Sequence, residues 1–130
     1  MNFEDEKDYI MRIIKEMVRV LFSLILGKQY QAVILPGENK ADALGKEFEK
    51  YRQMADQGYI NEAENEILEN TDYSNISQVC ALIAFYEHLS TLGEDFLREH
   101  DFSMQEVLDG LRQAAEKTGY GSLVDSILEE

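Results

Sequence analysis

The stretch "DYIMRIIKEMVRVLFSLILGK", Asp8 to Lys28, is the most apolar part of the chain and decides how the fold is to be interpreted. A membrane-spanning helix needs about 20 consecutive apolar residues, whereas the longest run here, Val20 to Leu26, has seven residues and includes Ser23. A secretory signal starts with a basic region and ends at a small-residue cleavage site. Here the acidic segment "NFEDEKD" precedes the apolar run, and no such cleavage site follows it. We therefore expect a helix that packs against protein.

The polar residues of this helix form one narrow stripe. Arg12, Lys15, Glu16, Arg19 and Ser23 recur at intervals of three and four, which places them on one face of an α-helix. Apolar residues cover the rest of the surface, so the helix must be packed on two or more sides. We expect it to be the central helix of the chain, with one apolar face left for a second copy in a homodimer. The expected interface residues are Met17, Val18, Leu21, Phe22, Leu24 and Ile25.

A peripheral membrane adaptor is the alternative for the same helix. In that arrangement the basic stripe would face anionic headgroups while the apolar arc entered the interface. The stripe holds only three bases and one acid, and the chain has no Trp to anchor it. The surrounding chain is strongly acidic, which opposes approach to an anionic membrane. We therefore expect the helix to be buried by protein.

Length and composition predict one helical domain spanning residues 1–130. Apolar residues make up 45% and charged residues 29%, the balance of a globular protein. There is one proline, and helix-forming residues dominate. The expected fold is an all-α, irregular bundle of six to seven helices.

The net charge of −14 restricts the partners that the chain can bind. Nucleic-acid binding depends on clustered Lys and Arg, so this composition excludes it. A protein partner is expected to be basic. Three acids at helical spacing form the expected acidic contact face: Glu62, Glu66 and Glu69.

Turn-forming residues divide the rest of the chain into elements. Residues 1–8 are expected to be an acidic tail and residues 28–40 a connecting loop. Helices are expected over residues 41–57, 59–70, 76–92, 103–118 and 123–128, with a short helix or turn at 94–100. Ser103 with Glu106, and Ser122 with Asp125, match the capping pattern of a helix start. Expected core-facing residues include Phe48, Tyr51, Ala55, Ile60, Ala63, Ile67, Leu68, Ile76, Val79, Cys80, Ile83, Tyr86 and Leu89.

Two resemblances support this architecture. In "ADQGYINEAENEILE", Gly58 and Ala63 stand five residues apart across a turn, which resembles the small-residue positions of a tetratricopeptide repeat. This resemblance covers about 30 residues and implies an antiparallel helical hairpin. The whole chain also resembles a family of short, uncharacterised bacterial helical proteins, through "DYIMRIIKEMVR" with "LGK" after it and "FYEHLSTLGEDFLREHDFSMQEVLDGL". The second resemblance implies a helical fold and a bacterial cytoplasmic setting, and it brings no activity or cofactor.

Residues that could carry chemistry form no recognisable site. Neither His88 nor His100 stands three residues after a Glu, the pattern of a metal site in a helical bundle. Cys80, the single cysteine, lies in "VCALIAF" and is expected to be a buried apolar residue of a reducing compartment. No phosphate-binding glycine loop or nucleophile motif occurs, so we expect no cofactor and no metal. Tyr30, Tyr59, Tyr73 and Tyr120 fall in turns, where packing is expected.

The sequence therefore predicts a non-enzymatic, cytoplasmic protein–protein interaction module that self-associates. An enzyme with an unrecognised site between helices is the least favoured alternative.

Overall fold

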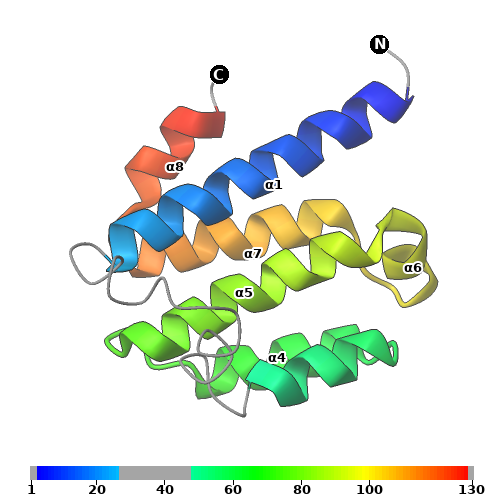
Figure 1. Ribbon diagram of the computed structural model, residues 1–130, viewed down its shortest axis with the longest axis horizontal. Coiled ribbons are helices and arrows are strands. Elements are labelled where there is room, and N and C mark those ends of the chain that lie inside the picture. Colours follow the sequence, from blue (N-terminus) through cyan, green and yellow to red (C-terminus); the bar gives the residue numbers. More distant parts are fainter. Residues whose placement is uncertain (1–2, 27–47, 129–130) are drawn as a thin grey trace, which may run out of the picture.

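The computed structural model describes residues 3–26 and 48–128, and this part of the chain is helical throughout, with short turns and no strand (Figure 1). The first element is α1, Phe3–Leu26, and a second helix includes residues 48–56. The remaining elements are α4 (Ile60–Asn70), α5 (Ile76–Leu92), α6 (Glu94–Glu99), α7 (Met104–Lys117) and α8 (Gly121–Leu128). The expectation of an all-α fold is confirmed. The predicted loop at 28–40 and the start of the predicted helix at 41–57 lie outside the described residues.

The central helix is α5, which packs against α1, α7 and α6 (Figure 1). All eight residues from Val79 to Tyr86 are buried, so this helix is covered on every side along two turns. The helix at residues 48–56 lies against another side of α5, where the rings of Tyr51 and Phe85 meet edge to face, 6.5 Å apart. The prediction that the first helix is central was therefore wrong. The physical reason is that α1 keeps an exposed charged stripe, whereas the middle of α5 carries no charge.

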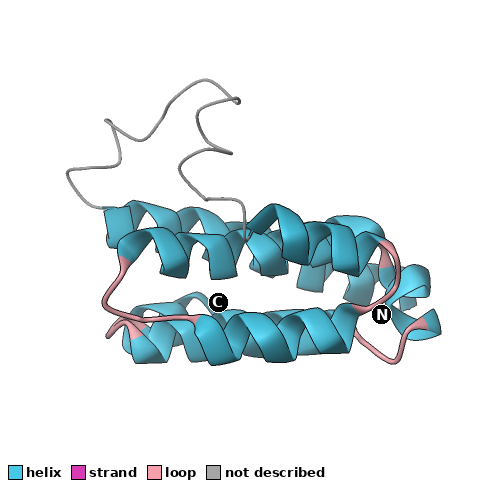
Figure 2. Cartoon of the chain, turned by 90° about the horizontal axis from the view of Figure 1, so that it is seen from below, coloured by secondary structure: helices cyan, strands magenta, loops and turns pink. Residues whose placement is uncertain are grey.

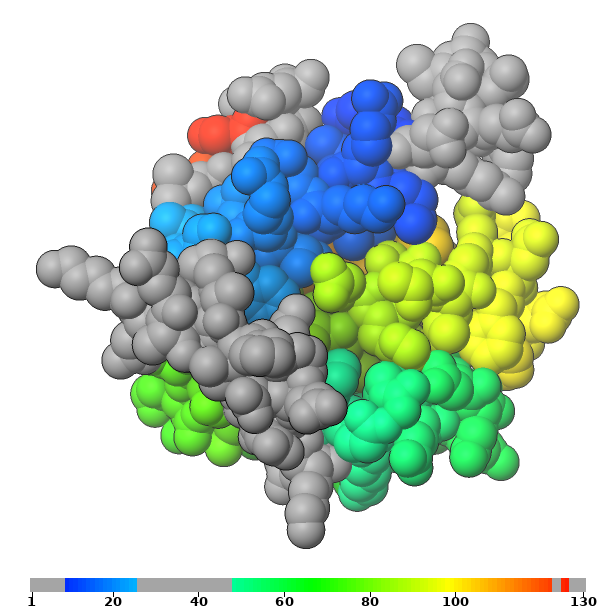
Figure 3. Space-filling view, in the orientation of Figure 1, coloured from blue at the N-terminus to red at the C-terminus, as the bar shows by residue number. Residues whose placement is uncertain are grey.

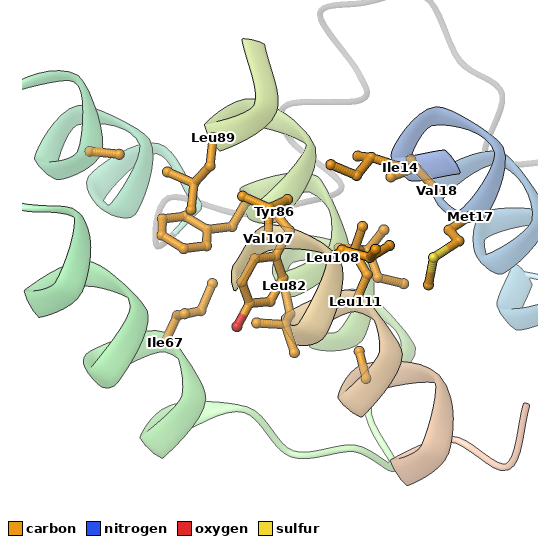
Figure 4. Close-up of a cluster of buried hydrophobic side chains, with 14 of the residues drawn as sticks. Ile14, Met17, Val18, Ile67, Leu82, Tyr86, Leu89, Val107, Leu108 and Leu111 are labelled. Carbon is orange, nitrogen blue, oxygen red and sulfur yellow. The ribbon is translucent and has the colours of Figure 1, made fainter. Parts of the chain in front are cut away.

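The helix α1 covers the other side of α5 and α7 and also contacts α8. Its core face is formed by Ile14, Met17, Val18 and Leu21, none of which is more than 3% exposed. Figure 4 shows Ile14, Met17 and Val18 beside Leu108 and Leu111 of α7. The predicted polar stripe is exposed along its whole length, as the spacing required.

The start of α1 differs from the prediction. Residues 3–8, expected to be an acidic tail, are helical and belong to α1. Acidic residues stabilise the first turns of a helix because its amino-terminal end carries a partial positive charge. Within the described residues, no helix is both long enough and apolar enough to span a membrane.

The helix at residues 48–56 and α4 form an antiparallel hairpin around Gly58. The φ of +98° at Gly58 is one that glycine adopts most easily. Two contacts between the helices fix their antiparallel alignment. The ammonium of Lys50 lies 2.5 Å from the carboxylate of Glu66, and Asn70 Nδ2 donates to the hydroxyl of Tyr51 at 3.1 Å.

The helix starts test three local predictions. Ser103 caps α7, accepting a hydrogen bond from the Glu106 backbone N–H at 3.1 Å, so that prediction is confirmed. Ser122 lies inside α8, which begins at Gly121, so its prediction as a cap was wrong. Ile76 was expected in the core but is 41% exposed, because it is the first residue of α5 and lies ahead of the covered turns.

Candidate functional site

The described surface presents a basic stripe on α1, which holds the three bases Arg12, Lys15 and Arg19 and the acid Glu16, all exposed. Arg19 donates to Glu16 on the same helix at 2.8 Å, and the two side chains remain 72% and 46% exposed. Tyr9, 44% exposed, lies on the same helix before the stripe. An exposed ion pair of this kind contributes little stability, so these charges can be used in contacts with another molecule.

The apolar arc of α1, in contrast, is largely used by the chain itself. Of the six predicted interface residues, Met17, Val18 and Leu21 are 0%, 3% and 0% exposed and belong to the core. Phe22 and Ile25 are partly buried and pack against that core. Leu24 is also partly buried, and its carbonyl accepts a hydrogen bond from the Tyr120 hydroxyl at 3.2 Å. A second copy could reach the first three side chains only by opening the core, because α5 and α7 already cover them.

The predicted acidic contact face lies on the outer side of α4. Glu62 and Glu69 are exposed, while the carboxylate of Glu66 pairs with Lys50 across the hairpin. The inner side of the same helix carries the buried residues Ile60, Ala63 and Ile67. In Figure 1, α1 lies at one edge of the molecule and α4 at the opposite edge, with α5 and α7 between them. The three bases of α1 and the exposed acids of α4 therefore lie at opposite edges of the fold.

The first histidine joins the hairpin to α5. His88 Nε2 lies 2.6 Å from Asp56 Oδ1, and Asp56 also accepts a hydrogen bond from Arg52 at 3.2 Å. Arg52 in turn pairs with Glu49. The imidazole is thereby held in a chain of contacts that runs from the helix at residues 48–56 to α5.

The second histidine fixes the loop between α6 and α7 against the hairpin. The ring of His100 packs against Phe96 with centroids 4.5 Å apart and the ring planes tilted by 41°, and Nδ1 lies 2.8 Å from the Phe96 carbonyl oxygen. A Cβ added to Gly58 would lie 2.4 Å from Nε2, so the ring occupies the space that glycine leaves. Asn61 Nδ2 donates to the carbonyls of His100 and Asp101 at 3.3 and 3.1 Å. Among residues 3–26 and 48–128, no three His, Cys, Asp or Glu side chains come together as metal ligands.

Cys80 lies in the middle of α5 and is 5% exposed. Burial raises the pKa of its thiol to about 11, so the thiolate, which is the nucleophilic form, is scarce near neutral pH. The prediction that Cys80 is a buried core residue is confirmed.

The sequence patterns did not reveal a partly buried polar contact between α4 and α5. The hydroxyl of Tyr86, a residue that is 1% exposed, donates to Glu64 Oε2 at 2.8 Å. The Tyr86 ring lies directly against Gly110 of α7, where an added Cβ would be 2.2 Å from ring carbon Cζ. A glycine in the middle of an otherwise strong helix was the available signal, because such a residue usually marks a close approach.

The charges of Glu106 and Glu64, together with burial, change the pKa values of the two groups in this contact. Burial raises the pKa of Glu64 and the neighbouring Glu106 charge raises it further, while the hydrogen bond from Tyr86 lowers it; the net direction is upward. Burial, followed by the Glu64 charge, raises the pKa of Tyr86. Tyr86 therefore remains a neutral donor at ordinary pH.

The turn tyrosines fall into different surroundings. Tyr59, at the hairpin turn, is 54% exposed. The ammonium of Lys117 lies 5.0 Å from the ring centre of Tyr73. The hydroxyl of Tyr120 donates a hydrogen bond to the Leu24 carbonyl near the end of α1. Tyr30 lies outside the described residues. Packing within the chain is therefore the role of Tyr73 and Tyr120, and Tyr59 is left at the surface.

The model of a family described as "Family of unknown function (DUF6483)" matches residues 4–119. No curated protein matches the chain, and no solved structure does.

Proposed function

The chain belongs to this family of unknown function, and we propose that it is a non-enzymatic interaction module that self-associates. The sequence resemblance predicted such a family of uncharacterised helical proteins. The exposed basic stripe of α1, on a chain of net charge −14, is the observation that carries the proposal. Such a segregated patch steers and orients a partner of opposite charge.

The acidic side of the fold supports the same proposal. Glu62 and Glu69 are exposed on α4, at the edge of the molecule opposite to α1. The acidic side of α4 can bind a basic surface of a partner, and the basic stripe of α1 can bind an acidic surface. The chain itself offers both kinds of surface, so a second copy is a natural partner.

Four groups of the described residues that could serve catalysis make structural contacts instead, which supports a non-enzymatic role. His88 and His100 hold the hairpin to α5 and to the loop before α7. The Tyr86 hydroxyl donates a hydrogen bond to Glu64. The thiol of Cys80 is buried and has a raised pKa. A buried, reduced cysteine also suits a cytoplasmic setting.

The peripheral membrane adaptor has less support. Insertion of an amphipathic helix into lipid requires its apolar arc to be available. On α1 the centre of that arc, Met17, Val18 and Leu21, is packed in the core. Flotation with anionic vesicles tests this alternative directly, and binding that requires Arg12 and Arg19 would favour the membrane over the proposed protein partner.

Sedimentation velocity over a concentration series tests self-association. The wild-type chain should show a weight-average mass that rises with concentration. The matched comparison uses two triple variants with the same change of charge. The first reverses the stripe with Arg12→Glu, Lys15→Glu and Arg19→Glu, and the second reverses bases elsewhere with Arg98→Glu, Arg112→Glu and Lys117→Glu. Self-association should be lost in the first variant only, and a wild-type chain that remains monomeric would contradict the proposal.

A further inference from the structure

The charges on α1 and α4 have matching spacings. Along α1 the bases Arg12, Lys15 and Arg19 are separated by three and then four residues. Along α4 the acids Glu62, Glu66 and Glu69 are separated by four and then three residues. When one helix runs antiparallel to the other, the two patterns coincide at every position. Arg12 then faces Glu69, Lys15 faces Glu66 and Arg19 faces Glu62.

We propose that α1 of one copy docks antiparallel on α4 of a second copy, through these three charge pairs. This inference rests on the proposed self-association and names the surfaces that carry it. The three pairs span eight residues of each helix, and the seven steps between the outer pairs cover about 10 Å at 1.5 Å per residue. A parallel arrangement would bring the outer charges together but displace the middle pair.

Both surfaces are accessible in the single chain. The bases lie on the exposed stripe of α1, opposite its core face. On α4, Glu62 and Glu69 are exposed, and the residues that face inward are Ile60, Ala63 and Ile67. In the space-filling view the blue surface of α1 and the green surface of the hairpin lie apart, with α5 between them (Figure 3).

Two ion pairs within the chain already use part of this charge. Arg19 pairs with Glu16, and Glu66 pairs with Lys50, whose side chain is 56% exposed. Exposed pairs of this kind are weak and exchange readily. Docking therefore adds a second partner to each group without breaking a buried contact.

The positions of the two helices also set the symmetry of assembly. In a two-fold dimer the same patch meets itself on both subunits, whereas contact between two different patches leaves one patch open on each end. Because α1 and α4 lie at opposite edges of the fold (Figure 2 shows the layers from below), one copy can engage two neighbours. Association should accordingly continue past the dimer as concentration rises.

A charge-swap experiment tests this inference. One variant reverses the outer bases, Arg12→Glu with Arg19→Glu. Its partner reverses the outer acids, Glu62→Lys with Glu69→Lys, and the middle pair stays intact in both. In sedimentation velocity each variant alone should associate at least about tenfold more weakly than wild type. An equimolar mixture should regain association, because each reversed surface again meets its opposite.

A matched control uses acids with the same spacing on another helix. Asp109 and Glu116 are seven residues apart and exposed on α7. The Asp109→Lys with Glu116→Lys variant should associate as strongly as wild type, because its α1 and α4 surfaces are unchanged. Circular dichroism confirms that each variant is folded. A smaller charge swap, with Arg19→Glu in one chain and Glu62→Lys in the other, repeats the test with one change in each chain.

The outcomes separate the inference from the function it rests on. A mixture that stays as weakly associated as its components overturns the α1–α4 contact, and so does an equal loss of association in the α7 control. If the wild-type chain still self-associates in that case, the proposed function stands and the contact surface is wrong. A wild-type chain that is monomeric throughout contradicts both.

Discussion

Replacing Gly110 by alanine should destabilise the protein, although alanine is normally favoured over glycine in a helix interior by about 1 kcal/mol. The new Cβ would lie 2.2, 2.4 and 2.6 Å from atoms Cζ, Cε1 and Oη of Tyr86. The ring is 1% exposed, so it has no solvent-filled space to enter. It must move into packed neighbours, and its hydrogen bond to Glu64 must stretch.

The size of the effect follows from these contacts. Overpacking a core typically costs about 1–3 kcal/mol. A hydrogen bond to a charged group contributes about 1.5–3 kcal/mol, of which only part applies here because Glu64 is half-exposed. After the gain in helix propensity is subtracted, the free energy of unfolding of Gly110→Ala should be about 1–3 kcal/mol lower than that of wild type.

Urea unfolding followed by circular dichroism measures this free energy. The Tyr86→Leu variant supplies the control, because its shorter side chain leaves room for the new methyl group. Gly110→Ala should cost less in that background, with a favourable coupling of at least about 1 kcal/mol. A Gly110→Ala protein as stable as wild type would refute the close approach of Tyr86 to α7.

Three further outcomes are expected. Ser103→Ala should lower the free energy of unfolding by about 1 kcal/mol, since it removes the cap of α7; an unchanged urea midpoint would argue against the cap. The raised pKa of Glu64 means that its contribution to stability is fully present below its unfolded pKa and is lost as pH rises through its folded pKa. In a pH series of urea unfolding, wild type should therefore lose stability relative to Glu64→Gln as pH rises through this range; an identical pH dependence of the two proteins would count against the partly buried carboxyl. Leu21→Asp should abolish cooperative thermal unfolding, because Leu21 is fully buried, and a folded monomer would instead place this residue at an interface.

Local patterns predicted much of the fold. The predicted range 76–92 is the observed range of α5, because the polar run before it and Gly93 after it bound one long apolar segment. The capping box at Ser103 likewise located the start of α7. The narrow stripe of α1 was predicted to face outward, and it does. These features depend on neighbours within a few residues, which the sequence lists in order.

Features that depend on distant residues could not be predicted in this way. The periodicity of α1 shows that Met17 and Leu21 share an apolar face, but it cannot tell whether that face meets another helix of the same chain or a second copy. The contact of Tyr86 with Gly110 joins residues 24 positions apart, and the Glu64 hydrogen bond joins residues 22 apart. Each requires the relative placement of α4, α5 and α7, which local spacing does not supply.

The central claim is that the charged outer sides of α1 and α4 serve as binding surfaces for other copies of the chain. Amide chemical shifts recorded by NMR over a dilution series test it residue by residue. Concentration-dependent shifts should gather around Arg12, Lys15 and Arg19 on α1 and around Glu62 and Glu69 on α4, while the buried middle of α5 stays unchanged. Shifts that are absent, or that gather on another part of the described surface, would contradict the claim.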